Sequence, residues 1–186
     1  IHDLLQESCK EWIPNGSEQD ETLKDIQDGL DTIKRRSQGL LHFVDAYRNM
    51  TVVFKPEFKI VSLEDLFSRV KKLMQAHINE KKIAFTISIE PPSLELLADP
   101  ELIEQVLINL LLNALQSAEK QFHPVIQLRA YVDHNGRNAV QVIDNGPGIK
   151  PDDMEKIFIP FYSTKETGSG IGLSLSRQIM RLHRGG

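Results

Sequence analysis

Residues 100–119 read PELIEQVLINLLLNALQSAE, and the rest of the fold can be arranged around this stretch. A proline at the first position and the absence of any later proline or glycine predict one helix from Pro100 to Glu119. Its apolar face contains Ile103, Val106, Leu107, Leu110, Leu111, Ala114 and Leu115. A polar stripe on another side contains Gln105, Asn109, Asn113 and Gln116. The stretch therefore predicts an amphipathic helix that packs on one side and offers amide groups on another.

The segments on both sides of this helix alternate between strand and helix patterns. Ser62 is typical of an N-cap, and it precedes a predicted helix over 63–82 with an apolar face of Leu66, Val70, Leu73, Met74 and Ile78. Short β-rich runs are predicted at 52–54, 58–61, 83–89, 125–133 and 138–144, and a last helix starts near Gly172. The turn-forming residues 134–136 join two of the strands as an antiparallel hairpin. Residues 52–186 are therefore expected to form a two-layer α/β sandwich with a mixed sheet, in a chain of the α+β class.

The N-terminal part has a different pattern. Positions expected to face inward repeat at 3-4 spacing in a predicted helix over 20–50, namely Leu23, Ile26, Leu30, Ile33, Ser37, Leu40, Val44 and Tyr47. A shorter helix over 1–12 and the turn formers at 13–17 predict a helical hairpin over residues 1–51. Such a hairpin is half of a bundle, which a second copy of the chain would complete as a homodimer.

Composition excludes several classes of function. Acidic residues outnumber basic ones, 26 to 22, and the net charge of −4 argues against nucleic-acid binding. Cys9 is the only cysteine, so the chain has no internal disulfide and no cysteine-based zinc site. No apolar run reaches the roughly 18 residues of a membrane span, so no membrane contact is expected from these residues.

Two glycine clusters indicate a ligand. Residues 144–149, DNGPGI, directly follow a strand, and residues 168–173, GSGIGL, directly precede a helix. Glycines that open a helix present free backbone N–H groups and the positive end of the helix dipole, which suits phosphate. The alternative is a flexible loop followed by an ordinary helix start.

Asp144 ends a strand beside the first cluster, where its carboxylate can accept a hydrogen bond from an exocyclic amine. Adenine carries an amine at the position where guanine carries a carbonyl oxygen, so a fixed carboxylate there favours adenine. The alternative is an Asx turn in front of Gly146.

Asn109 and Asn113 lie one turn apart on the polar stripe. An amide oxygen is a suitable ligand for Mg²⁺ that already carries phosphate oxygens, although a solvated polar face is the simpler interpretation. Between the glycine clusters, Phe158, Phe161 and Tyr162 could anchor a closing flap from which Lys165 reaches a terminal phosphate. The alternative is that Phe158 and Phe161 belong to the core.

In this order, the segments resemble the ATP-binding domain of two-component sensor histidine kinases, within the wider family of gyrase, Hsp90 and MutL, with its Bergerat-type fold. The matching motifs are residues 107–114 (N box), 144–149 (first G box), 158–162 (F box) and 168–173 (second G box). The hairpin over 1–51 resembles part of the dimerisation and histidine-phosphotransfer domain. The short link from Lys165 to Gly168 and the segment 33–36 resemble the nitrogen-regulation sensor branch.

The resemblance implies ATP and Mg²⁺ as cofactors, with Asn113 as metal ligand and with Asn109 and Lys165 in catalytic roles. It implies nucleotide contacts at Asn109, Asn113, Asp144, Gly146, Gly148, Ile149, Phe158, Thr164, Lys165, Gly168, Ser169, Gly170, Ile171, Gly172 and Leu173. ATP-hydrolysing relatives carry a glutamate in place of Asn109, and an asparagine cannot act as that base, so phosphoryl transfer is favoured over hydrolysis.

The expected activity is transfer of the γ-phosphoryl group to a histidine of the dimer and then to an aspartate of a response regulator. His2 lies only about three turns before the hairpin, so the acceptor is expected upstream and His2 is the alternative. Further sheet strands are expected beyond residue 186. Such a kinase is cytoplasmic, free or as the cytoplasmic part of a membrane-anchored sensor. The competing function is a silent nucleotide-binding module that couples ATP occupancy to packing of the helical bundle.

Overall fold

The structure is a computed structural model that describes residues 26–34, 37, 55–119, 121–165 and 168–185. The chain divides into two units, residues 1–51 and 52–186, which are described separately. In the first unit the described residues are helical, and Ile26 and Ile33 of the predicted seam are 41% and 63% exposed. The expected helix over 1–12, the turn at 13–17, most of 20–50 and the strand at 52–54 lie outside the described residues. The dimerisation role of the first unit stays a prediction.

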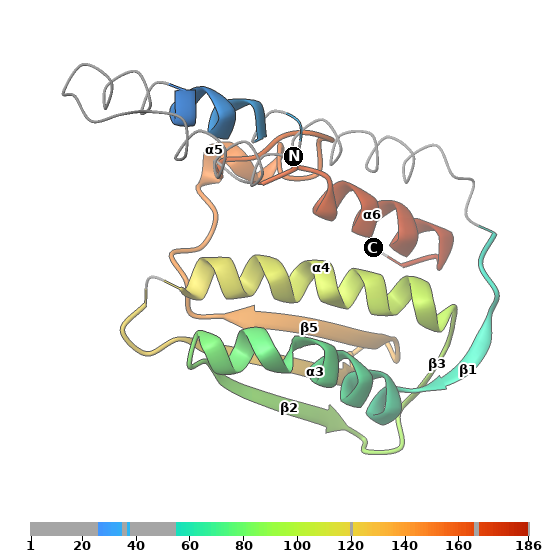
Figure 1. Ribbon diagram of the computed structural model, residues 1–186. Helices are drawn as coiled ribbons and strands as arrows, with labels where there is room; N and C mark the ends of the chain where they lie inside the picture. Colours follow the sequence, from blue (N-terminus) through green and yellow to red (C-terminus); the bar gives the residue numbers. More distant parts are fainter. Residues whose placement is uncertain (1–25, 35–36, 38–54, 120, 166–167, 186) are drawn as a thin grey trace. The chain divides into compact units, whose positions relative to one another are not determined.

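The second unit mixes strands and helices along the chain (Figure 1). Its elements are β1 (Lys59–Ser62), α3 (Leu63–Glu80), β2 (Ala84–Glu90), β3 (Glu95–Ala98), α4 (Pro100–Ala118), β4 (Val125–Val132), β5 (Asn138–Asp144), α5 (Pro151–Met154) and α6 (Gly172–Leu182). In the described part of the chain, no helix is both long and apolar enough to cross a membrane.

A three-stranded sheet of mixed orientation forms one layer of this unit. β4 is the middle strand, parallel to β2 and antiparallel to β5. The β4–β5 hairpin turns at Gly136, whose φ of +74° favours glycine, and the Asp133 carboxylate accepts the backbone N–H groups of Asn135 and Arg137. The predicted fold class, an α/β sandwich with a mixed sheet, is confirmed.

A second, two-stranded sheet was only half predicted. β1 pairs antiparallel with β3, with Lys59 opposite Ala98 and Ser62 opposite Glu95. The sequence indicated β1 but not β3, a four-residue strand between the Pro91-Pro92 pair and Pro100. The short helix α5 was also missed, whereas the other elements of this unit begin within two residues of their predicted starts.

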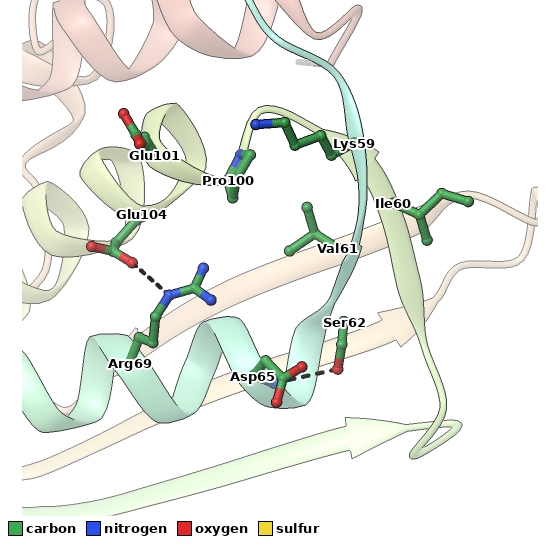
Figure 2. Close-up of a pocket in the computed structure, with 9 residues that line it drawn as sticks. All are labelled: Lys59, Ile60, Val61, Ser62, Asp65, Arg69, Pro100, Glu101 and Glu104. Atoms are coloured by element: carbon green, nitrogen blue, oxygen red, sulfur yellow. Dashed lines mark hydrogen bonds and ion pairs between the residues drawn. The ribbon is translucent and has the colours of Figure 1, made fainter.

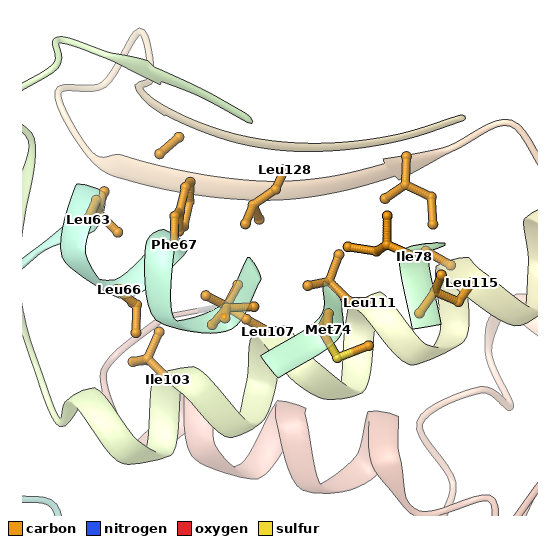
Figure 3. Packing of buried hydrophobic residues seen from close by; sticks show 14 of the residues in the cluster. Leu63, Leu66, Phe67, Met74, Ile78, Ile103, Leu107, Leu111, Leu115 and Leu128 are labelled. Carbon is orange, nitrogen blue, oxygen red and sulfur yellow. The ribbon is translucent and has the colours of Figure 1, made fainter. Parts of the chain in front are cut away.

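Helices α3 and α4 lie against one face of the three-stranded sheet, and the core fills the space between them (Figure 3). Phe67, Leu111, Ile126 and Leu128 are almost completely buried. One predicted core position is wrong, because Leu73 is 56% exposed. It lies on the edge of the apolar face of α3, beyond the part that α4 and the sheet cover.

Caps fix where α3 and α4 begin. The Ser62 side chain accepts the Asp65 backbone N–H at 3.3 Å, as predicted. At α4, one oxygen of Asp99 accepts the N–H groups of Glu101 and Leu102, and its other oxygen accepts that of Glu57. The Asp99 backbone N–H in turn donates to Nε2 of His183, at the end of α6. The start of α4 is therefore held by two segments far from it in the sequence, at Glu57 and at His183.

Candidate functional site

The two glycine clusters and the segment between them contact the polar side of α4. Asn109 contacts the second glycine cluster, Asn113 contacts Lys165 of the flap segment (residues 158–165), and Ser117 packs against the first glycine cluster. These contacts are spaced four residues apart on α4, so one helix face gathers segments from three separate parts of the chain.

Asn109 joins α4 to the start of α6. Its amide nitrogen donates to the Gly172 carbonyl oxygen at 3.3 Å and to the buried Ser176 hydroxyl at 3.5 Å. Helix α6 begins at Gly172, and its N-cap residue Ile171 makes no side-chain capping bond. The N–H groups of the first turn of α6 therefore have no side-chain cap and lie beside Asn109, as a phosphate site requires. Ile171 is 5% exposed, so its side chain belongs to the packed interior and not to such a site.

The first glycine cluster fits closely against α4. A Cβ atom on Gly146 would lie 2.9 Å from the backbone carbonyl carbon of Ser117 and still closer to its hydroxyl oxygen, so glycine is favoured at this position. The Gly146 backbone N–H donates to Oδ1 of Asp144 at 2.8 Å, which is the Asx turn weighed as the alternative role of Asp144. In the described part of the chain no hydrogen bond reaches Asp144 Oδ2, so the turn leaves one carboxylate oxygen for a ligand.

Asn145 is a residue whose role was not predicted. Its side-chain oxygen accepts the Val125 N–H at 2.9 Å, and its side-chain nitrogen donates to the His123 carbonyl oxygen at 2.7 Å. These hydrogen bonds connect the end of β5 to the start of β4 and thereby fix the position of Asp144.

Lys165 reaches across to α4 from the flap segment. Its ammonium lies 2.8 Å from Oε1 of Gln116 and 3.2 Å from Oδ1 of Asn113. Partial burial lowers the pKa of Lys165, and the negative charge of Asp144 opposes that shift without cancelling it. Asp144 of the first glycine cluster, Lys165 of the flap segment and the amide oxygens of α4 thus share one electrostatic environment.

The flap segment is anchored by hydrogen bonds and not by burial. Phe158 and Phe161 are 38% and 45% exposed, so the interpretation of both as core residues is wrong. The Tyr162 hydroxyl donates to the Asp153 carboxylate, a bond that raises the pKa of Tyr162. Phe158 lies beside α6, where the Arg177 guanidinium sits 5.0 Å from the centre of its ring.

The donor set around Asn113 suits a cation. Among the described residues, no three His, Cys, Asp or Glu side chains converge on a possible metal position. The amide oxygens of Asn113 and Gln116 nevertheless converge on one positive charge, the Lys165 ammonium. Neutral oxygen ligands of this kind fit Mg²⁺ that also carries phosphate oxygens and waters.

The remaining predicted residues lie around this face. Gly148, Ile149, Thr164, Gly168 and Ser169 are exposed, and Leu173 is half-buried in the first turn of α6. Ser117 was missed, although its spacing from Asn109 and Asn113 repeats every four residues and could have indicated it.

A separate groove lies between β1 and the first turns of α3 and α4 (Figure 2). Arg69 of α3 and Glu104 of α4 form an ion pair across it, with Nε and Oε2 3.1 Å apart. None of the predicted site residues lines this groove, so it is distinct from the polar face of α4.

Comparison with known proteins identifies the type of domain. Residues 98–186 match the family described as "Histidine kinase-, DNA gyrase B-, and HSP90-like ATPase". Over 156 residues the chain is 33% identical to the signal transduction histidine-protein kinase AtoS of Escherichia coli K12, an alignment that covers 84% of this chain and 24% of AtoS. The chain therefore spans about a quarter of that relative.

Solved structures agree with this match. The nucleotide-free catalytic domain of histidine kinase ThkA is 35% identical, with a TM-score of 0.61 over 67% of this chain and 80% of that one. ThkA in complex with the response regulator protein TrrA is similar to the whole chain, with a TM-score of 0.63, 25% identity and 51% of that chain covered. Full-length ShkA in complex with AMPPNP has a TM-score of 0.65 and 26% identity over 93% of this chain and 36% of that one.

Proposed function

The chain belongs to the histidine kinase family, and on that premise we propose that it binds Mg²⁺ and ATP on the polar face of α4 and presents the γ-phosphoryl group to a histidine acceptor. The observation that carries the proposal is the convergence of Asn109, Asn113 and Ser117 with the two glycine clusters and Lys165. The AMPPNP bound by ShkA supports a nucleotide as the ligand.

Each side chain has a proposed task that its observed contacts allow. Asp144 receives the adenine amine on Oδ2, while its Oδ1 stays in the turn with Gly146. The phosphates lie against the open first turn of α6, between Asn109 and residues 168–173. Asn113 would hold Mg²⁺, which supplies positive charge to the phosphate oxygens when it is bound. Lys165 would add a second positive charge from the flap.

Asn109 determines which reaction follows. Its amide nitrogen is used in bonds to α6, and an amide oxygen does not take a proton from water near neutral pH. Water is therefore not activated at this position, and the γ-phosphoryl group is kept for an acceptor held in line with it.

We extend the proposal to the whole protein. The exposed seam residues Ile26 and Ile33 support a homodimer through the first unit, and the ThkA–TrrA complex supports a response regulator as the final phosphate acceptor. The short spacing from Lys165 to Gly168 supports membership of the nitrogen-regulation branch.

Two experiments test these steps. Titration of a fluorescent ATP analogue, with and without Mg²⁺, tests the nucleotide site in the chain as printed. Incubation of the whole protein with γ-labelled ATP should give a phosphate bond that is labile in acid and stable in base, as expected of phosphohistidine. Binding without labelling of the whole protein would favour the silent regulatory module instead.

A further inference from the structure

Gln116 has no task in the proposed reaction, yet it makes the shorter of the two bonds to Lys165. Its Oε1 lies 2.8 Å from the Lys165 ammonium, whereas Oδ1 of Asn113 lies 3.2 Å away. Gln116 and Asn113 are three residues apart on α4, so their side chains project from neighbouring positions on one face. The side-chain oxygens of Gln116 and Asn113 thus form a cation site, and the cation that they bind is the Lys165 ammonium.

The rest of the flap segment supports this placement. The Phe161 N–H donates to the Gly170 carbonyl oxygen at 3.0 Å, and the Tyr162 hydroxyl is held by Asp153. The Lys165 backbone N–H donates to the Ser163 hydroxyl at 3.1 Å. The backbone of Lys165 is thus held in a turn, so the contact with α4 costs side-chain entropy but little further backbone entropy.

We infer that Gln116 is a positioning residue that holds the Lys165 ammonium against Asn113 in the nucleotide-free protein, so that Lys165 competes with the divalent cation for the Asn113 oxygen. The inference rests on the proposed function, because it assumes that Asn113 is the metal ligand. It adds a regulatory feature, because the metal that enters with the nucleotide must replace the Lys165 ammonium at the Asn113 oxygen.

Electrostatic repulsion prevents Mg²⁺ and the Lys165 ammonium from binding the Asn113 oxygen at the same time. Mg²⁺ binds an oxygen ligand at about 2.0–2.1 Å, so a metal on Asn113 would lie only a few ångströms from an ammonium bonded to the same oxygen. Like charges at that distance repel strongly. Binding of the metal therefore releases Lys165 from Asn113, and the freed ammonium can turn towards the phosphates that arrive with the metal.

The first test measures the Mg²⁺ concentration that gives half of the metal's full effect on binding of a fluorescent ATP analogue. Gln116→Leu removes the shorter bond to Lys165 and should lower this concentration by roughly three- to tenfold. In a Lys165→Met background no ammonium competes, so the same change at Gln116 should have no effect. Gln75→Leu, an identical change at an exposed position of α3, serves as the control and should leave the concentration unchanged.

An equal shift in both backgrounds would mean that Gln116 acts on the metal directly, and no shift in either would mean that Lys165 does not compete. Either result overturns the inference.

The second test needs no nucleotide. An amine-acylating reagent, read by mass spectrometry, should modify Lys165 more slowly than Lys72 of α3, which is also exposed, because the bond to Gln116 holds the Lys165 amine, and Gln116→Leu should remove that protection. Equal reactivity of Lys165 in the two proteins overturns the inference. If the wild-type chain fails to bind the analogue, the proposed function fails, and the labelling result still decides whether Gln116 holds Lys165.

Discussion

The backbone of Phe161 lies where a side chain on Gly170 would have to be. A Cβ atom on Gly170 would approach the Phe161 carbonyl carbon to 2.5 Å, and the Phe161 N–H donates to the Gly170 carbonyl oxygen at 3.0 Å. Both residues also have positive φ, +68° at Phe161 and +69° at Gly170. The middle glycine of the second cluster thus joins the flap segment to the start of α6, in addition to any contact with phosphate.

We expect Gly170→Ala to weaken binding of a fluorescent ATP analogue and to lower the free energy of unfolding by more than the roughly 1 kcal/mol that a positive φ costs an alanine. Gly136→Ala is the matched control, because Gly136 has a φ of +74° and open space around its Cβ position. The control should lose about 1 kcal/mol of stability and keep its nucleotide affinity. Equal losses of stability in the two variants would contradict the role of the contact with Phe161.

Asp144→Asn should weaken ATP binding by about 1.5–3 kcal/mol, the value of a hydrogen bond to a charged group. The asparagine can keep the Asx turn to the Gly146 N–H through its side-chain oxygen, so the fold should persist. Its amide nitrogen, however, replaces the second acceptor with a donor. Asp133→Asn makes the same change in the turn of the β4–β5 hairpin and should leave affinity unchanged. Unchanged affinity in Asp144→Asn would remove Asp144 from the site.

Asn113→Ala should abolish the increase in nucleotide affinity that Mg²⁺ produces while leaving metal-free binding of adenosine almost intact, because only the metal ligand is lost. The measurement is a titration of the nucleotide analogue at several Mg²⁺ concentrations. Asn79→Ala, on α3, provides the control. A variant that still responds to Mg²⁺ as the wild type does would return Asn113 to an ordinary polar face.

Asp99 connects stability to pH. Burial raises the pKa of its carboxyl. Hydrogen bonds from the backbone N–H groups of Glu57, Leu102 and Glu101 together lower the pKa by more than burial raises it, so the net pKa lies below the usual value of 3.8. A lowered folded-state pKa gives stability that is present above the unfolded-state pKa and is lost as the pH falls through the folded-state value.

Asp99→Ala should therefore lower the free energy of unfolding by about 1 kcal/mol near neutral pH, the usual value of an N-cap. The difference from the wild type should shrink as the pH falls below about 4. Chemical denaturation at a series of pH values measures both effects. Asp99→Asn keeps an N-cap acceptor without the titration, so its stability should be less dependent on pH, and a difference that grows in acid would contradict this account.

The sequence patterns predicted helix starts and strands, which depend on neighbouring residues. Ser62 and Pro100 indicated the starts of α3 and α4, and the residues of 138–144 indicated β5. The pairing of β1 with β3 joins segments more than thirty residues apart through two four-residue strands, and no periodicity in such short runs indicates a partner. Leu73 fits the helical period, but its exposure depends on how far α4 extends over α3.

In the candidate site, too, local patterns indicated individual residues but not the contacts between distant segments. The motifs indicated Asn109, Asn113, Asp144 and the glycines, because their residue types suit phosphate, metal and adenine. The bond between Gln116 and Lys165 joins residues 49 positions apart and depends on the path of the flap segment, which no local pattern specifies. For the same reason the sequence did not indicate that the Phe161 backbone fills the space beside Gly170.

The central claim is that the polar face of α4, with the segments gathered on it, selects an adenine nucleotide. Its most direct test is competition at saturating Mg²⁺, in which unlabelled ATP or GTP displaces a fluorescent ATP analogue from the chain. ATP should displace the analogue fully, and GTP should bind at least about tenfold more weakly, because guanine presents its O6 acceptor to the Asp144 carboxylate. Equal displacement by the two nucleotides, or no displacement by ATP, would contradict the account.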